Sequence, residues 1–274
     1  FMPQLKAILR AGVYGKAAIM VPMVINVAEI LKVKEFIEAA KVELAQEGKK
    51  YADDVQVGID AKGAADALHP DVLVRRVLDR PLHQLKGVRA LGIRGCAVSM
   101  PFKESCMPFL DAIDPSASVI DSVNTIVNDN GTLTGFNTDY IAVKSLIASH
   151  QLNSSARVMI RGSGGMGKAV IAAFRDAGFS DVIIAARNEV NGTALAKQYG
   201  FRWQPRPEAE GIDILVNVTP IGMAGGKEST QLAYSEAMVT RASVVFDVVA
   251  LPAETPVIQL AQRLGKKTIS GAEV

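Results

Sequence analysis

The sequence contains few of the residues that would indicate a disulfide scaffold, a zinc site or a membrane anchor. Only two cysteines occur, Cys96 and Cys106, and their spacing fits neither a disulfide framework nor a zinc motif. The longest apolar stretch, residues 17–31, is too short to span a bilayer and is interrupted by Pro22 and Glu29. The N-terminus also lacks the layout of a signal peptide. These absences predict a cytoplasmic protein with no metal and no membrane partner.

An excess of charge of one sign is missing as well. The formal net charge is +2, and basic and acidic residues are mixed along the chain, so we expect no nucleic-acid partner. The 274 residues, of which 49% are hydrophobic, suffice for two α/β domains or for one domain and a fragment. Because the chain begins with Phe1 and ends with Val274, we expect it to be cut at both ends.

Strand and helix patterns alternate along most of the chain. A strand near residues 17–22, a helix over 28–48 and a strand over 55–59 predict a strand–helix–strand unit with parallel pairing. Residues 60–81 fit neither neighbour and are treated as a junction. Beyond residue 140, strands separated by helices predict a doubly wound parallel sheet of the Rossmann type.

A hairpin is predicted around the Asn130–Gly131 pair, which is flanked by two β-rich runs. A two-residue turn there sets a register in which Asn124 falls opposite Asn137. Asp139 lies two residues further on, on the same face as Asn137. The hairpin is therefore expected to bring Asn124 and Asp139 close together, and a slip of one residue would undo this.

A glycine-rich loop follows the apolar strand that begins at Val158. Gly162, Gly164 and Gly167 have the G-x-G-x-x-G spacing and open an amphipathic helix. The first glycine permits the tight turn, the second admits a pyrophosphate, and the third allows the helix to pack closely on the strand. The loop predicts dinucleotide binding, and a structural turn is the alternative. The remaining loop residues assigned to the cofactor are Ser163, Gly165 and Met166.

The end of the next strand predicts which dinucleotide is bound. An NAD site usually has an acidic residue there, whereas this strand ends with Arg187 followed by Asn188. A guanidinium suits a 2′-phosphate, so we expect the cofactor to be NADP, bound by both residues. Arg187 could instead be a surface arginine, and Glu189 could take the ribose role.

Several further motifs occur in a fixed order: "GIRGCAVSMPFKE", "SVNTIVND", "GFNTDY", "GSGGMGKA", "AARN", "NVTPIGM", "FDVVALPAETP" and "TISGAE". With these motifs the sequence resembles the shikimate dehydrogenase family, most closely its shikimate dehydrogenase-like branch, from about Leu82 to Val274. The resemblance implies a reversible, NADPH-dependent reduction of 3-dehydroshikimate in aromatic amino-acid biosynthesis. It does not distinguish shikimate from a relative such as quinate.

The resemblance also implies site residues. Lys103 matches the catalytic lysine and Asp139 its carboxylate partner, while Ser99 and Asn124 match residues that hold substrate hydroxyls. A positioned ammonium can protonate the alkoxide that forms when a ketone accepts a hydride. The simpler alternatives are a solvated Lys103 and an Asp139 that caps a helix. The residues expected near the nicotinamide are Thr219, Pro220 and Met223.

The chain departs from this family before Leu82. The family's Ser-x-Ser loop, which holds the substrate carboxylate, is not found there, nor does its C-terminal helical segment follow "TISGAE". Ala97 and Ser99 stand where many relatives have Asn and Thr. Residues 1–58 instead resemble part of the phosphoenolpyruvate-binding barrel of phosphotransferase-system enzyme I. That family's Val-Glu-Thr-Pro metal site is replaced by "IDAKGAAD", so no catalytic residue is assigned to this segment.

The sequence therefore predicts a chimera of the α/β class. It comprises a Rossmann-type doubly wound sheet, a partial α/β substrate domain and an N-terminal strand–helix–strand segment. The expected divisions are a barrel fragment (1–59), a junction (60–81), a partial substrate-binding domain (82–139) and an NADP-binding domain (140–274). Residues 15–59 could fill the missing positions of the substrate-domain sheet. The alternatives to a dehydrogenase are a dinucleotide-binding module without turnover and a fragment of a phosphoenolpyruvate-utilising phosphotransferase.

Overall fold

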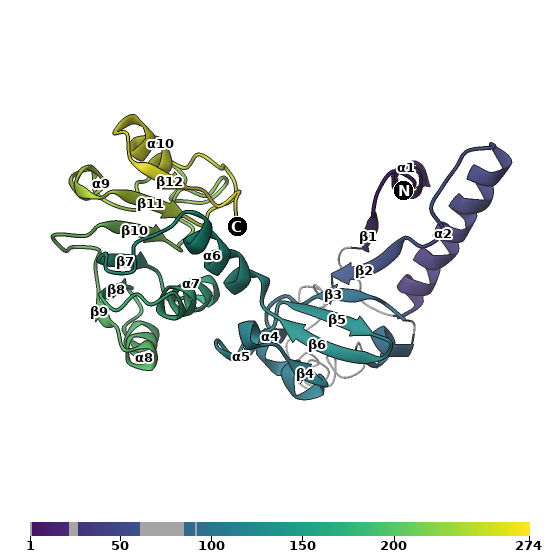
Figure 1. Cartoon of the computed structure of the whole chain (residues 1–274), viewed down its shortest axis with the longest axis horizontal. Coiled ribbons are helices and arrows are strands. Elements are labelled where there is room, and N and C mark those ends of the chain that lie inside the picture. Colours follow the sequence, from purple (N-terminus) through teal and green to yellow (C-terminus); the bar gives the residue numbers. More distant parts are fainter. Residues whose placement is uncertain (1, 22–26, 61–84, 91) are drawn as a thin grey trace. The chain divides into compact units, whose positions relative to one another are not determined.

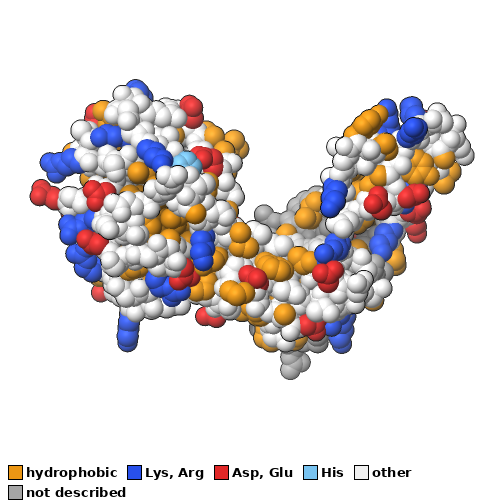
Figure 2. Space-filling view, viewed as in Figure 1, with side chains coloured by type: hydrophobic (Ala, Val, Ile, Leu, Met, Phe, Trp, Pro, Cys, Tyr) orange, Lys and Arg blue, Asp and Glu red, His pale blue; other side chains and the backbone are white. Residues whose placement is uncertain are grey.

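The computed structural model describes residues 2–21, 27–60, 85–90 and 92–274. The chain forms two compact units, the N-terminal unit (residues 1–137) and the C-terminal unit (residues 138–274) (Figure 1). Within the described ranges, no helix combines the length and the apolar character that crossing a membrane requires. Basic and acidic side chains are interspersed on the face shown in Figure 2, as the mixed charge pattern predicts.

The N-terminal unit contains the predicted strand–helix–strand unit, which follows helix α1. Strand β1 (Ala18–Val21) pairs in parallel with β2 (Gln56–Asp60), and helix α2 (Val27–Gln46) connects them. Helix α1 (Met2–Ala11) packs against α2, because both present apolar side chains at helical spacing. The buried side chains that form this core are Leu5, Leu9, Ile19, Ile37, Ala40 and Leu44.

Strand β2 also pairs in parallel with β3 (Gly95–Ala97), with Ile59 opposite Cys96. The first two strands therefore join one sheet, whose described part has six strands in the order β1-β2-β3-β5-β6-β4. The finer division of residues 1–139 predicted from the sequence stays a prediction. Further elements of the unit are α4 (Phe102–Ser105), η1 (Met107–Phe109), β4 (Ala112–Ile113), α5 (Pro115–Ser118), β5 (Thr125–Asp129) and β6 (Thr132–Phe136).

The predicted hairpin and its register are confirmed. Strands β5 and β6 are antiparallel with Thr125 opposite Phe136, the register that the Asn130–Gly131 turn requires. Both turn residues have positive φ, +50° and +93°, as a two-residue turn of this kind demands. The side chain of Asn128 fixes the turn, since its Oδ1 accepts a hydrogen bond from the Gly131 N–H at 2.8 Å.

The C-terminal unit is a Rossmann-type doubly wound sheet. Its strand order is β12-β11-β10-β7-β8-β9, and all of its neighbouring strands are parallel. The order reverses between β7 and β10, which are consecutive in space but not in sequence, so a ligand crevice is expected at their carboxyl ends. The strands are β7 (Val158–Arg161), β8 (Val182–Ala185), β9 (Arg202–Gln204), β10 (Ile214–Asn217), β11 (Val244–Asp247) and β12 (Lys267–Ile269).

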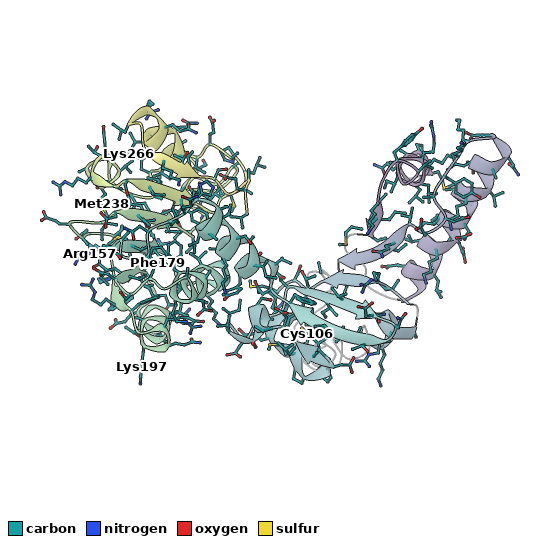
Figure 3. All side chains as sticks on the ribbon, in the orientation of Figure 1. Cys106, Arg157, Phe179, Lys197, Met238 and Lys266 are labelled. Atoms are coloured by element: carbon teal, nitrogen blue, oxygen red, sulfur yellow. The ribbon has the colours of Figure 1, made fainter. Side chains whose placement is uncertain are left out.

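Helices pack against this sheet, and their apolar side chains form the core with it. Helix α7 buries an almost continuous apolar face. Its Phe174 contacts Phe179, with ring centroids 4.9 Å apart. Phe179 is labelled in Figure 3. Helices α6 and α7 pack against one another, as do α9 and α10. The helices are α6 (Thr138–Ser149), α7 (Gly165–Asp176), α8 (Glu189–Tyr199), α9 (Glu236–Arg241) and α10 (Pro256–Arg263).

Candidate functional site

The glycine loop joins β7 to the N-terminus of α7, and its glycines are required by close contacts. Gly162 has φ +124°, and a Cβ there would lie 2.7 Å from a Val218 methyl group. A Cβ on Gly167 would lie 3.1 Å from the Gly162 carbonyl oxygen, so the helix packs closely against the loop. Gly164 is the N-cap of α7 and has open space around it. An anion can therefore approach the backbone N–H groups at this helix terminus.

The end of β8 lies beside the loop and carries the predicted NADP discriminator. The Gly162 N–H donates to the Ala185 carbonyl at 2.9 Å, which fixes the loop against β8. Asn188 is the N-cap of α8, where its Oδ1 accepts from the Asn191 N–H at 3.0 Å. Part of the Asn188 side chain is therefore used to begin the helix, whereas Arg187 stands directly before that cap.

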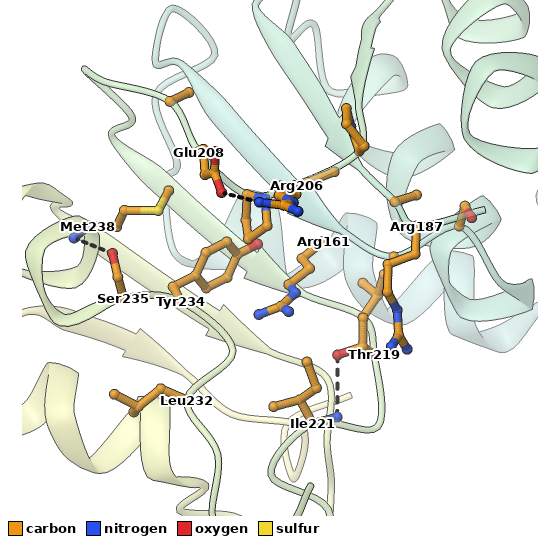
Figure 4. Close-up of a pocket in the computed structure, with 18 of the residues that line it drawn as sticks. Arg161, Arg187, Arg206, Glu208, Thr219, Ile221, Leu232, Tyr234, Ser235 and Met238 are labelled. Atoms are coloured by element: carbon orange, nitrogen blue, oxygen red, sulfur yellow. Dashed lines mark hydrogen bonds and ion pairs between the residues drawn. The ribbon is translucent and has the colours of Figure 1, made fainter. Parts of the chain in front are cut away.

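A cleft of about 1320 Å³ in the C-terminal unit joins these features (Figure 4). It extends from the glycine loop across the ends of β8 and β10 to the first turns of α9. Gly165, Met166 and Gly167 lie in the first turn of α7, outside the lining, and Met223 lies beyond it with 42% of its surface exposed. The predicted cofactor residues that line the cleft are Gly162, Ser163, Gly164, Arg187, Asn188, Thr219 and Pro220.

A buried hydrogen-bond network holds Thr219 in place. The Asn217 Oδ1 accepts from the Thr219 N–H at 3.1 Å and from its hydroxyl at 2.6 Å. Asn217 in turn donates to Asp247 Oδ1 at 3.0 Å, and Thr255 donates to the other carboxylate oxygen at 2.7 Å. Burial raises the pKa of Asp247, although these hydrogen bonds oppose the shift. The network fixes the loop after β10, which forms one wall of the cleft.

Sequence reasoning did not identify several residues of the cleft. Arg161 ends β7 and donates a hydrogen bond to the Ala233 carbonyl. Tyr234 is fully buried, and its hydroxyl lies 2.7 Å from the Val216 carbonyl and 3.1 Å from that of Met159, so it bridges β10 and β7. An arginine at the end of an apolar strand was a signal for Arg161, whereas nothing in the irregular segment before α9 indicated Tyr234.

Three of the predicted catalytic and substrate residues lie together in the N-terminal unit. The Asn124 carbonyl accepts from the Val98 N–H at 2.7 Å, directly before Ser99. The Lys103 carbonyl accepts from the Val123 N–H at 2.8 Å, directly before Asn124. Lys103 and Ser99 are both partly buried. These backbone contacts gather Ser99, Lys103 and Asn124 where β3 ends and β5 begins.

Asp139 belongs to the other unit, where it is the second residue of α6 and is partly buried. The next residue, Tyr140, anchors this helix turn, since its hydroxyl donates to Asp176 on α7 at 2.7 Å. Burial, followed by the hydrogen bond to Asp176 and then the Asp176 charge, raises the pKa of Tyr140 to about 12. The position of Asp139 is therefore fixed by helix–helix packing within the C-terminal unit.

The sheet order and the glycine loop at its switch point place the C-terminal unit in the class of Rossmann-type folds. A shikimate dehydrogenase-like protein of Haemophilus influenzae is 61% identical over 192 residues, covering 70% of this chain and 71% of the relative. A shikimate dehydrogenase (NADP(+)) of Archaeoglobus fulgidus is 36% identical over 204 residues, covering 72% and 73%. The chain belongs to the shikimate dehydrogenase family, as its motifs predict.

Solved structures agree with this assignment. A shikimate 5-dehydrogenase-like protein superposes with a TM-score of 0.71 at 46% identity, over 93% of this chain and 85% of that protein. Shikimate 5-dehydrogenase of Thermus thermophilus, in complex with NADP(H) and shikimate, superposes with a TM-score of 0.64 at 26% identity, over 84% and 79%.

Two family models match different parts of the chain. Residues 72–126 match the shikimate dehydrogenase substrate binding domain. Residues 1–80 match the PEP-binding domain of PEP-utilising enzymes, in agreement with the predicted chimera. The N-terminal strand–helix–strand unit thus has a different family likeness from the strands with which it pairs.

Proposed function

We propose that this chain is an NADP-dependent oxidoreductase that interconverts 3-dehydroshikimate and shikimate. The observation that carries the proposal is the cleft that brings the glycine loop together with Arg187 in a member of the shikimate dehydrogenase family. Arginine rather than an acidic residue at the end of β8 favours a 2′-phosphate over a free ribose hydroxyl. Relatives named shikimate dehydrogenase (NADP(+)) support the same cofactor.

The proposed roles follow from the chemistry of ketone reduction. When bound, NADPH supplies a hydride to the carbonyl carbon. Lys103 Nζ gives a proton to the oxygen as the alkoxide forms, and takes it back in the direction of oxidation. Asp139 is proposed as the carboxylate partner of this lysine. Ser99 and Asn124, which lie beside Lys103 in the N-terminal unit, are proposed to bind substrate hydroxyls.

The test measures cofactor binding and turnover separately. NADPH binding is followed by fluorescence, and turnover by the loss of NADPH absorbance with 3-dehydroshikimate or by its gain with NADP⁺ and shikimate or quinate. We expect Lys103→Ala to bind NADPH as the wild type does while kcat falls by about 10²–10⁴. Turnover by Lys103→Ala at the wild-type rate would contradict the role of this lysine.

A binding module without turnover is the second candidate. It is favoured by one observation. Residues 1–80 match a different family model from residues 72–126, and strands β1 and β2 share a sheet with β3 and β5 of the substrate-binding domain. The outcome specific to this candidate is wild-type protein that binds NADPH tightly but reduces none of the substrates. Wild-type protein that binds neither NADPH nor NADH would exclude both candidates.

A further inference from the structure

Arg161 is an unusual residue for its position. The three residues before it in β7 are apolar and buried, and Gly162 of the glycine loop follows directly. The side chain is partly buried and lies inside the cleft (Figure 4). Its Nη1 donates to the Ala233 carbonyl. A guanidinium carries five N–H donors, so this single backbone contact leaves most of its donors for a ligand.

A second guanidinium lies in the same cleft. Parallel pairing places Arg161 beside Ala185 of β8, two residues before Arg187, and both arginines line the cleft. Burial lowers the pKa of Arg161; Tyr234 and Glu228 oppose this shift, and the Arg187 charge adds a smaller effect in the same direction as burial. Two like charges held near one another in a partly buried cleft disfavour each other until an anion binds.

The other arginines of the cleft each lie close to a carboxylate. Arg206 lies 3.8 Å from Glu208, and Arg241 lies 3.8 Å from Glu210. In the ranges that the structure describes, neither Arg161 nor Arg187 has a carboxylate oxygen within 4.0 Å of its guanidinium nitrogens. Arg206 and Arg241 therefore have a close carboxylate partner, whereas Arg161 and Arg187, at the ends of β7 and β8, have none within ion-pair distance among the described residues, although the Glu228 charge acts on Arg161.

We propose that Arg161 and Arg187 form a two-arginine site for the 2′-phosphate of the dinucleotide, with Arg161 as a second specificity-determining residue. This inference rests on the proposed function and extends it. The pyrophosphate belongs to the backbone N–H groups of the glycine loop at the N-terminus of α7. A phosphate with several acceptor oxygens can accept hydrogen bonds from two guanidinium groups at once. The bond to the Ala233 carbonyl holds Arg161 ready for this contact.

The experiment compares the Kd values of NADPH and NADH in matched variants of the full chain. Arg161→Gln removes the charge while keeping an N–H donor for the Ala233 carbonyl, and Arg161→Lys keeps the charge. Arg206→Gln is the control, because it removes a charge from the same cleft that is already paired with Glu208. We expect Arg161→Gln to raise the Kd of NADPH at least about tenfold and that of NADH less than about threefold. Arg161→Lys is expected to raise the Kd of NADPH less than Arg161→Gln does, because the charge is kept but the guanidinium fork is lost. Arg206→Gln is expected to leave the ratio of the NADPH and NADH Kd values within about threefold of that of the wild type.

A second measurement isolates the phosphate group. Adenosine 2′,5′-bisphosphate carries the 2′-phosphate, whereas adenosine 5′-monophosphate does not, and neither contains the pyrophosphate. Arg161→Gln should weaken the binding of adenosine 2′,5′-bisphosphate and leave that of adenosine 5′-monophosphate unchanged. Equal weakening of both nucleotides, or an unchanged preference for NADPH over NADH in Arg161→Gln, would overturn the assignment of Arg161 and leave the proposed function standing. A wild-type protein without NADPH binding would overturn both. Thermal unfolding of each variant confirms that it is folded.

Discussion

At the scale of single residues, the buried carboxylate of Asp247 connects three backbone segments at the end of the sheet. It accepts from Asn217 at the end of β10, from the Val249 N–H at 3.0 Å, and from Thr255 at the start of α10. Asn217 extends the network to Thr219 in the wall of the cleft. Asp247 therefore acts on the cofactor cleft through other residues.

Removing this carboxylate should be costly, because several buried donors would lose their acceptor at once. We expect Asp247→Ala to lower the free energy of unfolding by about 3 kcal/mol, from unsatisfied groups that cost about 1–3 kcal/mol each. Thr255→Val removes one of the three hydrogen bonds and should cost about 1 kcal/mol. Urea denaturation of both variants measures the difference. Equal effects of the two substitutions would show that the carboxylate is not the centre of the network.

At the scale of elements, α8 and β9 meet at a glycine. A Cβ on Gly192 would lie 2.3 Å from the indole of Trp203, whose Nε1 donates to the Ala186 carbonyl at 3.1 Å. Alanine is the better helix former, by about 1 kcal/mol. Steric overlap with a rigid ring outweighs that gain, because overpacking typically costs about 1–3 kcal/mol. Helix α8 thus needs a glycine for its approach to the strand.

Gly192→Ala should therefore destabilise the protein by about 1–2 kcal/mol despite the higher helix propensity of alanine. The displaced indole would also disturb Ala186, so NADPH binding should weaken because Arg187 follows directly. Val190→Ala is the control, since Val190 is on the same helix and 77% exposed. Thermal unfolding and NADPH titration test both variants, and an increase in Tm for Gly192→Ala would contradict the contact.

Glu47, directly after α2, forms ion pairs with Lys49 and with Lys6 of α1, and these pairs are expected to make stability depend on pH. Hydrogen bonds from Lys49 and then Lys6 lower the pKa of Glu47 to about 2, from 4.5. Because the folded state has the lower pKa, the stabilisation is fully present above pH 4.5 and declines as the pH falls towards 2. We expect the wild type to melt at a higher temperature than Glu47→Gln at about pH 6, and this difference to shrink by about pH 3 and at high salt. A difference that grows on acidification would contradict the assignment.

Much of the fold was readable from the sequence, for identifiable physical reasons. The hairpin register followed from Asn130–Gly131, and the doubly wound sheet followed from apolar strands alternating with amphipathic helices. Strand β9 was not predicted, because its three residues include Arg202 and form a strand only by pairing with β8. Arg161 and Tyr234 line the cleft but were not predicted to do so, because their placement depends on strand order and on a loop that packs back over the sheet.

At the scale of the whole molecule, each unit has its own core. In the N-terminal unit, one sheet contains strands from two regions of the chain that match different family models. The short strand β3 pairs with β2 on one side and with β5 on the other. Removing residues 1–60 would leave one edge of β3 unpaired and would remove the apolar cluster around Leu9 and Leu44.

Deletion of residues 1–60 should therefore produce a protein that aggregates or is digested rapidly in its N-terminal unit. The C-terminal unit, whose sheet pairs only within residues 138–274, should keep its resistance to protease. Size-exclusion chromatography and limited proteolysis with mass spectrometry measure both effects. A monodisperse deletion variant with the wild-type digestion pattern would show that β1 and β2 do not support β3.

The parallel pairing of β2 with β3 has an evolutionary consequence. Strand pairing is made by main-chain groups that every residue except proline supplies, so a sheet edge recognises the shape and length of an incoming strand more than its side chains. A strand–helix–strand segment from one protein family can therefore join the sheet of another family and still make the main-chain hydrogen bonds that its strands require. With the roles proposed for Lys103 and Asn124, we expect the functional constraint to lie at their end of the sheet and the outer strands to be open to replacement by recombination.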